Sequence, residues 1–182
     1  MKEIESFVRR TIATLDRDDP YSRAACAKLR RAVGRPLGEC PDVWEIILPN
    51  APEGKNSDNV IHTVVTLYAL HSQGKNESMS DNATGFGAAI AKLIDPSGSN
   101  ESAVRRRFNA VATSSEFTEL AHHARGLIQL LKASGVKMDY PRFASDLYYF
   151  QFPDNANTVR LKWGKQFYHV NISQNLEGTD EE

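Results

Sequence analysis

The sequence has 182 residues, of which 41% are hydrophobic and 25% charged, a balance typical of one folded domain or two small ones that share a core. It contains no apolar run of the ~18 residues that a membrane span needs, no signal-peptide-like start and only two cysteines, so we expect neither a membrane protein nor a disulfide-stabilised one, but a reduced, cytoplasmic protein. The net charge of −1 argues on its own against a general nucleic-acid binder, but basic residues are concentrated in 20–40 and 101–170 and acidic ones in 177–182, and such segregation can still build a basic face.

Hydrophobic residues recur with the 3.6-residue period of an α-helix, and no useful length of chain alternates as a half-buried strand would. Asp19 and Pro20 provide an N-cap and a first-turn proline for a helix that Gly34 ends. A long helix, capped by Ser57 or Asp58, is apolar on several sides and is therefore expected to be central and buried. The predicted helices of this half cover residues 3–15, 20–33, 42–48 and about 58–71.

The second half continues the helical pattern after a less ordered-looking stretch, Gly74 to Asn82. Asn100 is expected to cap one helix and Asp139 another, and Thr113 and Glu116 have the spacing of a capping box. The predicted elements lie at about 84–94, 101–112, from the Thr113 cap to 134, 140–150 and 157–170. The β-branched and aromatic content of the last element is also compatible with a strand.

These elements predict an all-α fold of about eight or nine helices in two packed helical bundles. We expect an N-terminal bundle over residues 1–95, a C-terminal bundle over 96–170 and an acidic, disordered tail over 171–182.

No reaction centre is apparent, so the sequence predicts a protein that is not an enzyme and has no metal or cofactor. His122 and His123 are adjacent, and on a helix their side chains point about 100° apart, which prevents them from binding one metal ion together. Cys26 lies in an alanine-rich helix and is expected to be a small buried residue. Cys40 lies in a turn with no histidine nearby in the sequence.

The positions of the arginines indicate a function more clearly than the histidines and cysteines do. Arg105, Arg106 and Arg107 are consecutive in one predicted helix, and the next carries one stripe made of His122, Arg125, Gln129 and Lys132. Arg30 and Arg31 form a third basic cluster in the first half. Guanidinium groups suit phosphate recognition, and no base-reading motif is present, so the clusters indicate non-specific backbone binding. The alternative is that these charged faces are only solvated.

Five segments, taken in order, resemble the CasB family, the small subunit of the type I-E CRISPR Cascade. They are RAACAKLRR at 23–31, VRRRFNA at 104–110, LAHHARGLIQLLK at 120–132, Asp139-Tyr140 and RLKWGKQFY at 160–168. The resemblance implies an all-helical, non-enzymatic subunit of an antiviral ribonucleoprotein complex that packs with a second copy of itself and with other Cascade subunits. It also implies that the subunit supports the CRISPR RNA–target DNA assembly and the displaced strand through backbone contacts.

Carried over by position, the resemblance assigns nucleic-acid contacts first to the matching arginines, which are Arg30, Arg31, Arg105, Arg106, Arg107 and Arg125. Further candidates are Lys132, Arg142, Arg160, Lys162 and Lys165, whereas Trp163 is assigned to the core. A competing interpretation is a helical protein–protein interaction module that bridges other subunits without touching nucleic acid.

Overall fold

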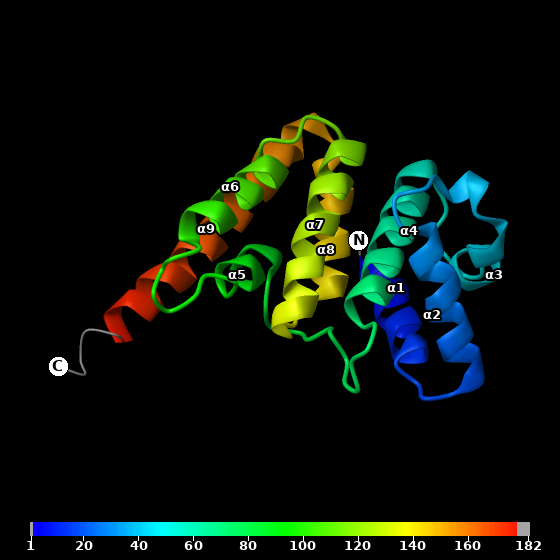
Figure 1. Ribbon diagram of the computed structural model, residues 1–182. Helices are drawn as coiled ribbons and strands as arrows, with labels where there is room; N and C mark the ends of the chain where they lie inside the picture. The colour runs from blue at the N-terminus through cyan, green and yellow to red at the C-terminus, as the bar shows by residue number, and fades with distance from the viewer. Residues whose placement is uncertain (1, 178–182) are drawn as a thin grey trace.

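Nine α-helices make up most of residues 2–177, the part of the chain that the computed structural model describes (Figure 1). Their bounds are α1 Lys2–Leu15, α2 Pro20–Ala32, α3 Trp44–Ile47, α4 Lys55–His71, α5 Phe86–Ala91, α6 Glu101–Ala112, α7 Phe117–Ser134, α8 Tyr140–Phe150 and α9 Pro153–Glu177. Two 3₁₀ turns, Leu37–Glu39 and Pro41–Val43, precede α3. Within residues 2–177 there is no strand, only a bridge between Ser80 and Met138, so the predicted all-α fold is confirmed.

Helix ends follow the capping rules at some boundaries and not at others. Asp19 and Asp139 accept hydrogen bonds from the backbone amides of Ser22 and Arg142, at 2.7 and 2.9 Å, as predicted. The side chain of Asn100 does not cap α6. Its Oδ1 atom instead accepts a hydrogen bond from the backbone N–H of Asp95, and its Nδ2 atom donates one to the backbone carbonyl of Leu93.

Three other expected boundaries were also wrong. α4 begins at Lys55, after Gly54, so neither Ser57 nor Asp58 caps it. The capping box of Thr113 and Glu116 does not form, because Glu119 accepts the bond from the Ser115 amide instead, at 2.8 Å. The last element is a helix and not a strand, and it begins at Pro153 rather than near residue 157. The proline suits the first turn of a helix, where its missing N–H is not needed.

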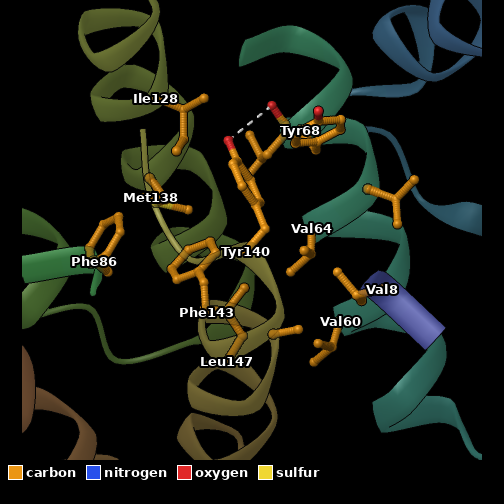
Figure 2. Packing of buried hydrophobic residues seen from close by; sticks show 14 of the residues in the cluster. Val8, Val60, Val64, Tyr68, Phe86, Ile128, Met138, Tyr140, Phe143 and Leu147 are labelled. Atoms are coloured by element: carbon orange, nitrogen blue, oxygen red, sulfur yellow. Dashed lines mark hydrogen bonds between the residues drawn. The ribbon is translucent and has the colours of Figure 1, made fainter. Parts of the chain in front are cut away.

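α4 occupies the centre of the molecule, as its apolar composition predicts. It packs against α1, α2, α7 and α8, and Figure 1 shows it between α2 on one side and the α7–α8 pair on the other. Figure 2 shows its inner side chains meeting those of α8, and the residues labelled there include Val60, Val64, Tyr68, Tyr140, Phe143 and Leu147. These six side chains are buried, so α4 is fixed in position by hydrophobic contacts.

α9 closes the other end of the core. Trp163 is fully buried, which confirms its assignment to the core, and the ring of Phe167 stacks on that of Phe108 at a centroid distance of 4.5 Å. α5 packs against α9 at Gly87, where a side chain would collide with the carbonyl oxygen of Trp163.

The buried apolar residues on both sides of position 95 belong to one cluster. The division into bundles of residues 1–95 and 96–170 stays a prediction. So does the disordered tail: α9 is described as far as Glu177, and residues 178–182 lie outside the described part of the chain.

Candidate nucleic-acid interface

A hollow of about 290 Å³ opens between the end of α2, the middle of α4 and the first half of α7. Its apolar surface comes from side chains that include Val33, Leu37, Leu67 and Phe117. Arg35 and Arg125 add two guanidinium groups, and none of the described residues that line the hollow carries a carboxylate. The guanidinium group of Arg35 donates a hydrogen bond of 2.9 Å to the backbone carbonyl of Glu39. The hollow therefore combines apolar walls with positive charge that no carboxylate among its described lining residues neutralises.

A glycine turn places Arg35 at this hollow. Gly34 has a φ of 79°, a left-handed conformation that ends α2 and that glycine adopts without steric cost. The Nε2 atom of His62 on α4 lies 2.8 Å from the carbonyl oxygen of Arg35. Because a carbonyl only accepts, Nε2 is the donor, and this bond fastens the turn to α4.

Burial keeps His62 suited to this structural role. Its side chain is 5% exposed, and desolvation lowers its pKa, although hydrogen bonds to the backbone of Arg35 and Ala32 oppose the shift. Burial thus favours the neutral ring, and its proton on Nε2 serves the bond to the Arg35 carbonyl.

Two more of the predicted cations, one on α2 and one on α7, lie near the C-terminal end of α4. Lys132 at the end of α7 donates a hydrogen bond of 2.7 Å to Oε1 of Gln73, just beyond the end of α4. Arg30 on α2 lines another hollow, of about 650 Å³, together with Gln73 and Lys75, and the acids Asp16, Asp18 and Glu77 line it too. Arg30 and Lys132 thus lie near Gln73, just beyond the end of α4, one coming from α2 and the other from α7.

We call this surface the basic groove, and define it by α4 as its floor and by Arg30, Arg35, Arg125 and Lys132 along its two walls. Three of these four residues were predicted from the sequence as nucleic-acid contacts. Their charges come from α2, the turn that follows it and α7, segments that the fold brings together around α4.

The remaining clusters are placed differently. Arg31 is exposed on α2. On α6, Arg105 pairs with Glu101, one turn earlier, whereas Arg106 and Arg107 are exposed. α6 packs against α7, but within residues 2–177 no hydrogen bond or ion pair joins these arginines to the basic groove.

Two of the predicted cations on α9 hold the fold together. Arg160 donates a hydrogen bond of 2.6 Å to the carbonyl of Ser114, and its guanidinium carbon lies 4.9 Å from the ring centre of Phe150. Lys162 forms an ion pair of 2.5 Å with Asp146. Lys165 and Arg142 are exposed.

Asp146 is a buried carboxylate with two donors. It accepts a second hydrogen bond, of 2.8 Å, from the indole nitrogen of Trp163. Burial raises the pKa of Asp146, and the hydrogen bond and charge of Lys162 oppose that shift. Lys162 therefore compensates a charge inside the protein, where an unpaired carboxylate would be costly.

The rings of His122 and His123 lie 5.5 Å apart and nearly perpendicular. Within the described residues no group of three or more His, Cys, Asp or Glu side chains is placed to hold a metal ion. Across residues 2–177, no helix combines the length and the apolar character that a membrane crossing needs.

The sequence did not single out Arg35, His62 or Phe117 as members of a site. Arg35 lies alone in a turn, and the other two have the spacing of core positions. Only the glycine before Arg35 gave a signal, because a helix that ends at Gly34 turns the chain sharply at that point.

Comparison with known families and structures gives consistent matches. The family model for CRISPR-associated protein Cse2 matches residues 25–168. The crystal structure of CasB from Thermobifida fusca is 30% identical, with a TM-score of 0.77 over 90% of this chain and 94% of that chain. The crystal structure of CasB from Thermus thermophilus is 20% identical, with a TM-score of 0.71 over 89% of this chain and 97% of that chain.

A chain from a structure described as a CRISPR RNA-guided surveillance complex is 18% identical and has a TM-score of 0.78, over 97% of this chain and 98% of that chain. The search of curated proteins gave no match.

Proposed function

Because the chain belongs to the CRISPR-associated Cse2 family, as its resemblance to CasB indicated, we propose that it is a non-catalytic small subunit of a type I-E surveillance complex. In this role it binds nucleic-acid backbone without sequence preference through the basic groove. Base pairing with the guide RNA reads the target sequence, so this subunit needs only to hold phosphates.

One observation carries the proposal: Arg35 and Arg125 meet at a hollow whose described lining residues include no carboxylate. Some described cations are paired with acids, as Arg23 is with Asp18 and Lys28 with Glu45, whereas within the described residues neither Arg35 nor Arg125 forms an ion pair. Unpaired cations brought together from two elements repel one another, and a bound phosphate chain removes that repulsion. Each neutralised phosphate also releases condensed counterions, which drives binding.

The proposed partners follow from the same family membership. They are the other Cascade subunits, a second copy of this chain, the CRISPR RNA and the target DNA. Leu161 and Tyr168 on α9 favour a protein contact as well, because they are seven residues apart on one helix and are 59% and 47% exposed. A purely protein-binding module is therefore the second candidate function.

The test replaces the four cations of the basic groove in one groove variant, Arg30→Gln, Arg35→Gln, Arg125→Gln and Lys132→Gln. A matched control variant replaces four exposed cations on α1 and just after α5, which are Lys2, Arg9, Arg10 and Lys92. Both variants lose the same charge, so a difference between them reports on position.

The complex is reconstituted with each variant and binding of target DNA is measured. The proposal expects normal assembly by size-exclusion chromatography and weaker DNA binding for the groove variant only. Loss of the groove variant from the complex before DNA is added would instead support the protein-binding function.

A further inference from the structure

We propose that the 290 Å³ hollow of the basic groove binds one unpaired nucleobase of a single strand whose phosphates contact Arg35 and Arg125. This inference rests on the proposed function and adds a base-binding site to it. The chemistry required is that of any flat heteroaromatic ring joined to a phosphodiester chain, and DNA and RNA both supply it.

The size of the hollow suits one base. Pockets for drug-sized ligands begin at about 300 Å³, and this hollow measures about 290 Å³. It is therefore large enough for a single ring system and too small for a base that remains stacked between its two neighbours. An unpaired base enters such a pocket at the lowest cost, because it has no partner strand to leave.

The lining suits a ring that is apolar on its faces and polar at its edge. Phe117 and His122 contribute aromatic side chains, and Leu37 and Leu67 contribute aliphatic ones. Bases stack on aromatic side chains with little regard to sequence, because every base has a π-face.

The polar groups in the hollow do not favour one base. The amide of Asn59 offers both a donor and acceptors, and the hydroxyl of Thr63 does the same. The hydroxyl of Thr66 already donates to the carbonyl of His62, at 2.7 Å. Such a set can satisfy the edge of any base, which agrees with a subunit that does not read sequence.

Charge distinguishes a nucleotide from a protein side chain as the occupant. An aromatic side chain of a neighbouring subunit would fill the same walls but would leave Arg35 and Arg125 uncompensated. A nucleotide fills the hollow with its base and neutralises these guanidinium groups with its phosphates. The combination of apolar walls and two unopposed cations therefore favours a nucleotide.

The direct test closes the hollow without changing any charge. Ala121 lines it from α7, and Ala121→Phe would place a ring inside it. Ala13→Phe, on an exposed position of α1, adds the same ring elsewhere and is the control. Affinity is measured for the full-length chain with single-stranded DNA and RNA oligonucleotides of about 16 nucleotides, the upper end of a single-strand site.

Stacking of one base typically changes affinity by about 5- to 150-fold, so we expect Ala121→Phe to bind about tenfold more weakly than the parent. Its salt dependence should stay unchanged, because no phosphate contact is lost. The control should bind like the parent. Loss with DNA alone or RNA alone would identify the strand, and loss with both would show that the pocket accepts either.

Failure of this inference is distinguishable from failure of the proposed function. If the groove variant binds weakly with a flatter salt dependence while Ala121→Phe binds normally, the base site is wrong and the proposed function stands. If neither variant differs from the parent, with oligonucleotides or in the assembled complex, both are wrong. If the parent chain binds no strand, the base site is wrong, and the groove variant in the assembled complex still tests the proposed function. If Ala121→Phe binds strands normally but is lost from the assembled complex, the hollow takes a protein side chain instead.

A measurement on the parent chain guards against a misfolded variant. An oligonucleotide that carries a single iodouridine is irradiated in complex with the full-length chain, and the cross-linked peptide is identified. We expect a cross-link to the first half of α7, where Phe117 and His122 line the hollow. Cross-links confined to peptides outside the hollow would overturn the proposal.

Discussion

Arg125 of α7 lies beside Gly34 at the end of α2, and a Cβ atom built on Gly34 would lie 3.4 Å from Nη1 of Arg125. This approach brings the arginine stripe of α7 next to the turn that carries Arg35. It closes one end of the basic groove over α4. Gly34 is favoured there for its left-handed backbone, and a Cβ atom at this position would lie in van der Waals contact with the guanidinium group.

Gly34→Ala should therefore destabilise the protein. A non-glycine residue in the left-handed region costs about 1–2 kcal/mol, whereas the added methyl group would only touch the mobile end of Arg125. We expect a loss of about that size in the free energy of unfolding, measured by urea denaturation.

Gly38→Ala provides the matched control, because Gly38 has no atom within 4 Å of the added Cβ and no positive φ. It should leave the stability unchanged or raise it slightly, since alanine restricts the unfolded chain. Equal stability of the two variants would show that the turn at Gly34 does not need its left-handed conformation.

Stability should fall in acid because of His71. This fully buried residue lies 2.9 Å from the hydroxyl of Tyr140 through Nδ1, and desolvation lowers its pKa from 6.5 to about 4. The unfolded chain then binds a proton at a higher pH than the folded one. The contribution of His71 is fully present above pH 6.5 and is lost as the pH falls from 6.5 to about 4.

His71→Leu should remove this part of the pH dependence, although it also removes the bond to Tyr140. The parent should lose up to about 1.4 kcal/mol per pH unit across that window relative to the variant. Urea unfolding at several pH values measures the difference. Parallel curves for the two proteins would mean that His71 is not held neutral by burial.

Arg160 should act on stability and not on the salt dependence of nucleic-acid binding. Arg160→Met keeps the contact with the ring of Phe150 but loses the hydrogen bond to Ser114. Hydrogen bonds from charged groups contribute about 1.5–3 kcal/mol, and we expect a loss of that size on urea unfolding.

Arg106→Met is the control for this substitution, since Arg106 is an exposed position on α6. Surface substitutions of this kind usually change stability by less than about 0.5 kcal/mol. If Arg160→Met strongly changed the salt dependence of nucleic-acid binding but left stability unchanged, Arg160 would be a nucleic-acid contact after all.

Local signals in the sequence were sufficient for much of the fold. The caps at Asp19 and Asp139 and the left-handed glycine at 34 act within a few residues of chain, so the pattern of residue types predicts them. Asn100 shows the limit of such reasoning. Its side chain forms two hydrogen bonds with the loop before α6, whereas capping the helix would give it one.

The candidate site was harder to predict because charge alone does not show which cations are used internally. Arg160 and Lys162 have the same sequence character as Arg30 and Arg125, yet they bind Ser114 and Asp146 within the fold. Arg35, in contrast, lines the candidate site although its sequence context does not indicate a binding residue. It belongs to no stripe, and it joins the groove only because the turn, α4 and α7 meet in three dimensions.

The salt dependence of target DNA binding tests the central claim most directly. Affinity is measured over a range of salt concentrations for complexes that contain the parent, the groove variant or the control variant. Each lost phosphate contact should flatten the slope of log affinity against log salt by about 0.7 for a single strand. The account predicts a slope flatter by about 2 to 3 for the groove variant and a parental slope for the control variant. Equal slopes for all three complexes would contradict it.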